Sequence, residues 1–389
     1  MTTYTVLIIL SGLVIFSYLL DLFAKKTRFP SVLLLLMSGI ALRYLTDYLG
    51  VATFDFLTML PLIGTVGLIL IVLEASLELK IERETIPMIK KSLGSAFFTL
   101  LVTSFSITLF LRFVTDQPFQ SCFINSIPYS VLSSAIVIPS AANLAGSKKE
   151  FVIYESVFSD ILGIIFFNFA LANAQLTTGA FLNLGFDMIL VLLISLAASF
   201  FLLYAMGRIR HNIKSFLIIS ILTLVYAVGK QLHLSSLIIV FAFGLFLNNI
   251  ETLRLPAARR LFLYEGFGGD MKQMASLTAE SAFVIKTFFF LIFGFVINPG
   301  LINDAAIFIY GAAILACIYL FRFVYLKVFV RNGLVPEFFI APRGLISILL
   351  FFNIPVHLRI EGAGEGLLLL IIFSTNIMMA VGLLKAKAA

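Results

Sequence analysis

The chain has 389 residues, of which 61% are hydrophobic and 12% are charged. A soluble domain carries about 25% charged residues, so the composition excludes a soluble globular protein and indicates a chain that lies mostly in lipid. The net charge of +7 comes from basic residues scattered over short loops, which is typical of a membrane protein rather than a nucleic-acid-binding one. Cys122 and Cys317 have no metal or redox spacing, and we expect no bound cofactor.

Thirteen hydrophobic segments are candidates for crossing the membrane, which requires about 20 apolar residues per helix. They cover about 4–23, 30–46, 56–79, 92–112, 121–145, 151–173, 186–207, 215–230, 234–249, 277–297, 302–326, 338–354 and 366–384. The sequence therefore predicts an all-α integral membrane protein that forms a single transmembrane transporter domain over residues 1–389. We expect no soluble regulatory domain, because the longest loop, Asn248 to Ser276, contains only a short stretch at 253–266 that is typical of an amphipathic surface helix.

The basic residues predict the orientation of the chain. Thirteen segments place the two termini on opposite sides, so the loops fall into two sets. One set holds 20 of the 27 basic residues, whereas the other holds only Arg43, Arg112, Lys230 and Arg359. The positive-inside rule then places the N-terminus outside and the C-terminus in the cytoplasm, in the plasma (inner) membrane.

Two segments carry helix-breaking residues near their centres. Segment 121–145 has Pro139 at its centre and three serines around it, which are Ser133, Ser134 and Ser140. Segment 338–354 has Pro342 and Gly344 on either side of Arg343. Paired interruptions in segments of opposite direction predict inverted repeats around a central site. The repeats would cover about 1–173 and 215–389, with about 186–207 as the linking segment. The alternative for either break alone is an ordinary proline kink.

Charged residues inside the hydrophobic segments are the candidate site. Asp160 lies about 12–14 Å from the Glu150 end of its segment, near the middle of a ~30 Å hydrocarbon layer. A charge there costs about 2.5–3.5 kcal/mol on insertion scales, so we interpret Asp160 as a residue that is charged and discharged in function. Lys286 also lies near mid-membrane and is a second candidate for a functional charge. The alternative interpretation is that Lys286 has a structural role and balances the dipoles at the ends of broken helices. Glu155 and Arg343 are expected to form an ion pair, the alternative being solvation at the interface.

Three motifs resemble those of the monovalent cation:proton antiporters, or sodium/proton exchangers. They are Glu155–Asp160 in the sixth segment, KTFFFLIFG at Lys286 and APRGLISILL around Arg343. The resemblance implies that Asp160 carries the ion and the proton, that Lys286 is the core cation, and that Glu155 and Arg343 form the structural pair. It also implies a homodimer. Two departures concern the ion: Ser159 replaces the family's Asn or Asp, and Val137-Ile138-Pro139 replaces Thr-Asp-Pro.

The predicted activity is secondary antiport of a monovalent cation against protons, serving pH homeostasis, and not enzymatic catalysis. Asp160, Ser159, Ser133, Ser134, Pro139 and Ser140 form the expected ion and proton site, which sodium, lithium or potassium could occupy. Sodium is the first expectation. The alternatives are a potassium/proton efflux antiporter and, from another class, a cation channel or uniporter; the sequence shows no ring of acidic residues or carbonyl-filter motif for the latter.

Overall fold

The computed structural model of the protein describes all parts of the chain except a few short stretches and one longer loop. The described residues are 3–27, 30–50, 56, 59–141, 144, 146–173, 178–208, 214–231, 236–250, 267–298, 300–301, 305–330 and 335–388. Every regular element in these ranges is helical, which confirms the predicted all-α fold. The amphipathic helix predicted at 253–266 lies outside the described residues.

Helices overlap each of the thirteen predicted segments. The first half of the chain forms α1 (Thr3–Thr27), α2 (Ser31–Tyr48), α3 (Leu60–Glu78), α4 (Ile86–Thr115), α5 (Phe119–Ser130), α6 (Ser134–Ser140), α7 (Gly146–Ala172) and α8 (Thr178–Arg208). The second half forms α9 (Lys214–Gln231), α10 (Leu237–Asn249), α12 (Phe267–Val296), α13 (Ala305–Tyr325), α14 (Leu345–Phe352) and α15 (Glu365–Ala388). Shorter turns of π- or 3-10 helix occupy Leu326–Val330, Val356–Leu358 and Glu361–Ala363.

Eight helical stretches in the described residues are long and apolar enough to cross a membrane, and α1, α9 and α10 contain shorter apolar stretches. Helix α7 is not among the eight, and it carries five charged residues between Lys148 and Asp160. Several helices begin at a proline, as in Pro30 before α2 and Pro118 before α5. Proline suits this position because the first turn of a helix has no acceptor for its N–H groups.

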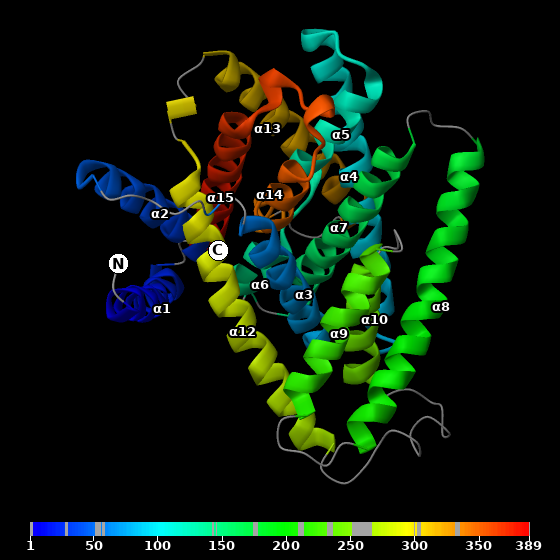
Figure 1. Cartoon of the computed structure of the whole chain (residues 1–389). Helices are drawn as coiled ribbons and strands as arrows, with labels where there is room; N and C mark the ends of the chain where they lie inside the picture. Colours follow the sequence, from blue (N-terminus) through cyan, green and yellow to red (C-terminus); the bar gives the residue numbers. More distant parts are fainter. Residues whose placement is uncertain are drawn as a thin grey trace.

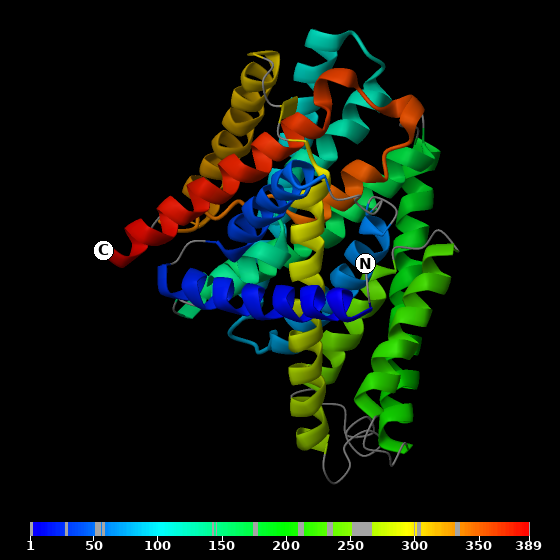
Figure 2. The same ribbon diagram turned by 60° about the vertical axis from the view of Figure 1, so that its left-hand side comes forward.

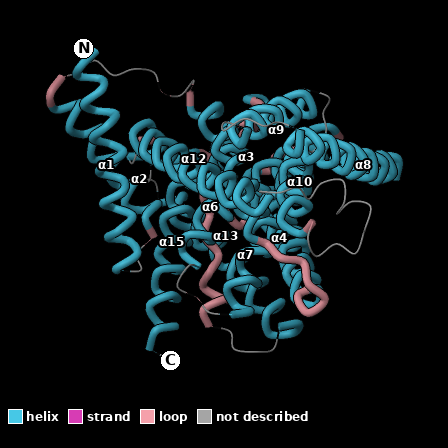
Figure 3. Tube along the Cα trace, turned by 90° about the horizontal axis from the view of Figure 1, so that it is seen from below, coloured by secondary structure: helices cyan, strands magenta, loops and turns pink. Residues whose placement is uncertain are grey.

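The helices form a bundle with α3, α5 and α6 near its centre. Figure 1 and Figure 3 both place α1 and α2 on one side of the bundle and α8 at the opposite edge. Only 18% of the apolar window of α8 is buried, against 89% for the stretch that contains α5 and α6, so α8 faces outward and α5 and α6 do not. Figure 2 shows α1 lying across α12 rather than alongside it.

Helices α2 and α12 approach each other closely through two glycines. A Cβ atom on Gly39 would lie 2.2 Å from the carbonyl oxygen of Leu291, and one on Gly294 would lie 2.3 Å from that of Leu36. Small residues at membrane helix contacts allow the backbones to pack together in this way. This pair of contacts holds α12, and with it Lys286, against α2, and α12 also packs against α3.

Candidate functional site

Two segments lose helical structure where they pass one another. Helix α5 ends at Ser130 and α6 begins at Ser134, and the residues between them are not helical. Helix α14 follows non-helical backbone at 340–344. The backbone N–H of Ser133 donates to the carbonyl oxygen of Pro342 at 3.0 Å, so the two interruptions are in direct contact.

Gly344 provides the space for this contact. A Cβ atom at this position would lie 2.4 Å from Ile136 Cδ1 and 2.9 Å from Ser133 Oγ. Its φ of −167° is ordinary extended backbone that any residue adopts. Gly344 is therefore required for the close approach of the two segments and not for an unusual backbone angle.

The interruption of the first segment lies earlier than its central proline predicts. Pro139 is inside α6, and the residues that leave the helix are 131–133. The expectation that the break is centred on Pro139 is therefore wrong. The reason is that side chains from other helices satisfy the backbone groups freed at 131–134, so the break forms where those partners are, not where a proline removes an N–H.

Arg343 satisfies the free carbonyl groups at the end of α5. Its Nε donates to the carbonyl of Tyr129 at 2.8 Å, and its Nη2 donates to that of Ser130 at 3.0 Å. Its Nη1 donates to the carbonyl of Ala341 at 2.6 Å, on its own segment. A cation at a helix C-terminus is favoured by the helix dipole as well as by these bonds. Arg343 thus joins the two interrupted segments.

Two adjacent residues of α7 hold the other side of the break. Ser159 Oγ accepts a hydrogen bond from the backbone N–H of Leu132 at 2.8 Å. Asp160 Oδ2 accepts from the backbone N–H of Ser134 at 3.2 Å and also from the hydroxyl of Ser134. Asp160 therefore lies at the N-terminus of α6, where a helix dipole stabilises a negative charge.

The structure brings some of the predicted site residues together and separates others. Asp160 is 1% exposed, and its Oδ1 has no hydrogen-bond partner among the described residues. The buried hydroxyl of Ser133 also lacks one in the described part of the chain. Ser134 contacts Asp160 directly, whereas Pro139 and Ser140 lie at the other end of α6 and make none of the hydrogen bonds to it. The result is a buried polar centre with two oxygen atoms free to bind a donor or a cation.

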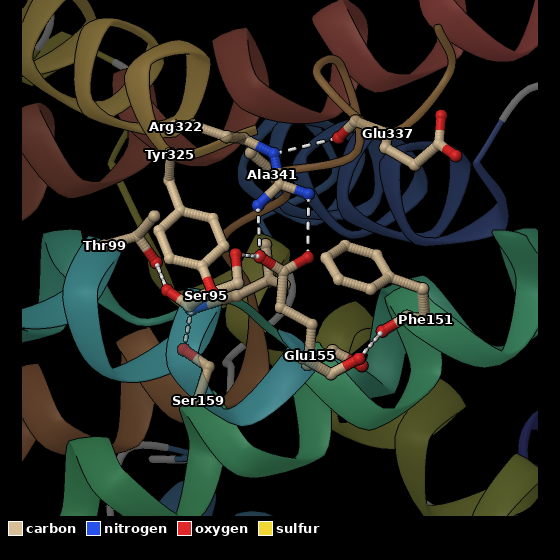
Figure 4. A network of polar contacts seen from close by, with 12 residues as sticks. Ser95, Thr99, Phe151, Glu155, Ser159, Arg322, Tyr325, Glu337 and Ala341 are labelled. Carbon is tan, nitrogen blue, oxygen red and sulfur yellow. Dashed lines mark hydrogen bonds and ion pairs between the residues drawn. The ribbon is translucent and has the colours of Figure 1, made fainter. Parts of the chain in front are cut away.

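Glu155 is paired with a different arginine from the one expected. Arg322 donates from Nη1 and Nη2 to the two carboxylate oxygens of Glu155, each at 2.9 Å (Figure 4). Ser95 Oγ donates to the same carboxylate at 2.5 Å, and Arg322 Nε donates to the carbonyl of Glu337 at 2.9 Å. Both charged side chains are buried. The predicted Glu155–Arg343 pair is therefore wrong, because Arg343 is fully used by backbone carbonyls.

Arg322 was missed because the sequence places it close to the cytoplasmic end of segment 302–326, where it reads as an interfacial residue. In the structure the helical segment continues beyond 326 through the π-helical turn Leu326–Val330. Arg322 is consequently deeper than expected and is 3% exposed. The length of the apolar run past Tyr325 was the one feature of the sequence that could have predicted the burial of Arg322.

Lys286 is half-buried on α12, which packs against α3. Its charge interacts with that of Glu74 on α3. The hydrogen bonds of Asp160 come from Ser134 and not from Lys286. Lys286 thus lies where α3 and α12 pack together, on the helix that faces Glu74.

Metal-binding side chains are dispersed in the described residues. No three of His, Cys, Asp or Glu in these ranges are grouped closely enough to hold a metal ion. His357 lies in the turn Val356–Leu358, and His211 and His233 lie outside the described residues. The polar centre around Asp160 offers oxygen atoms, the ligand type that hard cations prefer.

Two solved structures of one sodium proton antiporter have a similar fold. The structure of the sodium proton antiporter MjNhaP1 from Methanocaldococcus jannaschii at pH 8 matches with a TM-score of 0.70 and 18% sequence identity, covering 100% of both chains. An electron-microscopy structure of the same antiporter matches with a TM-score of 0.69 and 18% identity, over 100% of this chain and 96% of that one. At this identity the likeness establishes the fold alone.

Comparison with curated proteins gives no match. The sequence profile described as "Sodium/hydrogen exchanger, transmembrane" matches residues 11–354, which is most of the chain. The fold that the chain shares with the antiporter structures agrees with that match. The chain therefore belongs to the transmembrane sodium/hydrogen exchanger family, whose members are transporters rather than enzymes.

Proposed function

We propose that the protein exchanges a monovalent cation, sodium in the first place, for protons, and that Asp160 carries both in turn. The observation that carries the proposal is the burial of this carboxylate beside an interrupted helix, with Oδ1 left without a hydrogen bond in the described structure. A carboxylate inside a membrane is costly and is retained where it has a function. Proton and cation then compete for one negatively charged group.

The cation site that we propose is centred on Asp160, Ser133 and Ser134. A small hard cation prefers oxygen ligands, and the Asp160 Oδ1 atom and the Ser133 hydroxyl are both available. Ser134 changes from donating to Asp160 to offering a lone pair when a cation is bound. Ser159 has a positioning role, because its hydroxyl is occupied by the N–H of Leu132.

Pro139 and Ser140 belong to the same moving segment and do not enter this set of ligands. They lie at the far end of α6 from Asp160. Helix α6 would move with α7 as one unit, because Ser159 and Asp160 attach it there. Alternating access requires such a unit to expose the site first on one side and then on the other.

The same proposal includes the organisation of the chain in the membrane. The repeats are about 1–173 and 215–389, inverted with respect to each other, with segment 186–207 as the link. The N-terminus is outside and the C-terminus is in the cytoplasm of the plasma (inner) membrane, as the distribution of basic residues favours. The protein works as a homodimer in pH homeostasis.

Lys286 is the proposed core cation, and its role bears on the charge moved per cycle. One carboxylate that exchanges one proton for one monovalent cation moves no net charge. A second proton released from Lys286 would make transport electrogenic and add about 2.3 kcal/mol per 100 mV. We favour electroneutral exchange, in which Lys286 keeps its proton throughout the cycle, because Ser159 stands before Asp160 and the Asp-Asp pair is absent.

Reconstituted vesicles test the proposal. An outward sodium gradient should drive protons into vesicles containing the protein, and Asp160→Asn should abolish this movement while the protein remains folded. Asp116→Asn is the matched control, because Asp116 is exposed and has positive φ, a conformation that asparagine tolerates. Full exchange by the Asp160 variant would refute the role of this carboxylate.

A panel of sodium, lithium and potassium gradients identifies the ion and separates the alternatives. A response to potassium alone would indicate a potassium/proton efflux antiporter. Cation flux that persists without any coupled proton movement would indicate a channel or uniporter instead. Rates that do not respond to an imposed membrane potential would support the electroneutral scheme.

A further inference from the structure

A polar cavity whose lining does not include Asp160 lies where α4 and α7 begin. Its volume is about 290 Å³, roughly ten times the ~30 Å³ that one water molecule occupies in the liquid. It is lined by charged side chains of both signs, which are Glu84, Lys91, Lys148 and Glu337, together with Ser147. A cavity of this size with charges of both signs suits a small zwitterion better than a simple ion.

One part of the lining is suited to an anion. Lys91 and Lys148 contribute two ammonium groups, and Ser147 lies in the first turn of α7. Helix α4 starts after Thr85 without a side-chain cap, so Ile86 and Met88 in its first turn have N–H groups without a capping side chain, whereas Pro87 has no N–H. The N-termini of helices attract phosphate groups through these N–H groups and the helix dipole.

The other part is suited to an ammonium group. Glu337 is 4% exposed, and its Oε2 accepts no hydrogen bond from the described residues. Lys148 forms an ion pair with this carboxylate, with its Nζ 3.5 Å from Oε2, but donates its hydrogen bond to the carbonyl of Val335 at 2.7 Å. A buried carboxylate oxygen without a donor is costly, which points to a donor supplied by a ligand.

We propose that this cavity binds the phosphoethanolamine headgroup of phosphatidylethanolamine. The phosphate contacts Lys91 and Ser147, and the ammonium group donates to Glu337 Oε2. Phe151 and Val330 supply apolar walls for the glycerol end of the lipid. The cavity lies beside the first turn of α4, a helix long and apolar enough to cross a membrane, and basic pockets between membrane helices are known headgroup sites.

The site also has a structural link to the Glu155 pair. The carbonyl of Glu337 accepts from Arg322 Nε, and Arg322 holds Glu155 on α7 (Figure 4). A lipid bound at Glu337 would therefore stabilise the helix that carries Asp160. This inference is independent of which cation the protein transports.

Lipid retention measured by native mass spectrometry tests the site. Full-length protein is equilibrated with equimolar phosphatidylethanolamine and phosphatidylcholine, whose methylated ammonium group has no N–H to donate. We expect retention of the ethanolamine lipid to exceed that of the choline lipid by about tenfold, the equivalent of one charge-assisted hydrogen bond. Glu337→Met should remove this preference, and Lys91→Gln should weaken retention of both lipids.

Lys90→Gln is the control, because Lys90 is an exposed neighbour on α4 that does not line the cavity. Equal retention of the two lipids by the unmodified protein would overturn the proposal, and so would equal effects of Lys90→Gln and Lys91→Gln. Because the preference is a ratio within one sample, it is measurable in any variant that remains soluble in detergent. Retention of soluble phosphoethanolamine without retention of the lipid would overturn the assignment to a membrane lipid.

Discussion

Removing Arg322 tests whether Glu155 is paired with Arg322, as the structure shows, rather than with Arg343. Arg322→Leu would leave the Glu155 carboxylate buried, with the Ser95 hydroxyl as its one remaining donor among the described residues. Breaking a buried ion pair in this way costs about 3–5 kcal/mol, because one charge remains without compensation. The carbonyl of Glu337 would lose its Arg322 donor as well. Arg322→Leu should therefore be among the most destabilising single changes in α13.

The assay is thermal unfolding in detergent, followed by the fraction of protein that stays monodisperse on size-exclusion chromatography. At no more than about 2 °C per kcal/mol for a chain of this length, the midpoint should fall by up to about 6–10 °C. A double-mutant cycle with Glu155→Leu then measures the coupling of the pair. Glu155→Leu should recover most of the loss caused by Arg322→Leu, since no unpaired charge then remains.

The same cycle with Arg343 discriminates between the predicted and the observed pair. Arg343 donates to three backbone carbonyls and not to Glu155, so the Glu155–Arg343 cycle should show little direct coupling. Strong coupling of Glu155 to Arg343 together with weak coupling to Arg322 would refute the arrangement in Figure 4.

Three further changes test how the helices are held together. Gly294→Ala should strongly destabilise the protein, because its Cβ would meet the backbone carbonyl of Leu36, whereas Gly12→Ala should be neutral because nothing lies within 4 Å of that position; the midpoints of thermal unfolding give the comparison. Gly344→Ala should cost less, about 1–3 kcal/mol, because it mainly displaces a side chain, and it should slow exchange in vesicles more than it lowers stability. Arg343→Met leaves three carbonyls without donors and should cost at least about 1–3 kcal/mol, with protease sensitivity near residues 129–133 as its readout.

The composition and spacing of the sequence predict the helices because lipid imposes strong constraints on them. A chain in a bilayer must satisfy its backbone internally, so apolar runs become helices, and Pro128 and Pro139 lie inside theirs. The same constraint identified Asp160 and the two interrupted segments. A charged or helix-breaking residue inside an apolar run is costly in lipid, so it indicates a functional or structural role.

The partners of the charged side chains could not be predicted because they depend on packing between distant helices. Glu155 is bound by Arg322, whereas Arg343 donates to the free carbonyls at the end of α5, such as that of Ser130. Those free carbonyls have no signature in the sequence, and the continuation of the helix past Tyr325 has only the length of the apolar run. The position of the break relative to Pro139 was missed for the same reason.

The position of Asp160 at the end of α6 connects ion binding with the interrupted backbone. Asp160 Oδ2 accepts the N–H of Ser134, and its neighbour Ser159 accepts the N–H of Leu132, so α7 holds both sides of residue 133. If Asp160 carries the ion, as we propose, each change from proton to cation alters the charge that stabilises the N-terminus of α6. This change in charge acts next to Ser133, whose N–H donates a hydrogen bond to the carbonyl of Pro342 in the other non-helical stretch. The stability of the contact between the two non-helical stretches can therefore depend on whether Asp160 has bound a proton or a cation. Coupled exchange requires such a dependence.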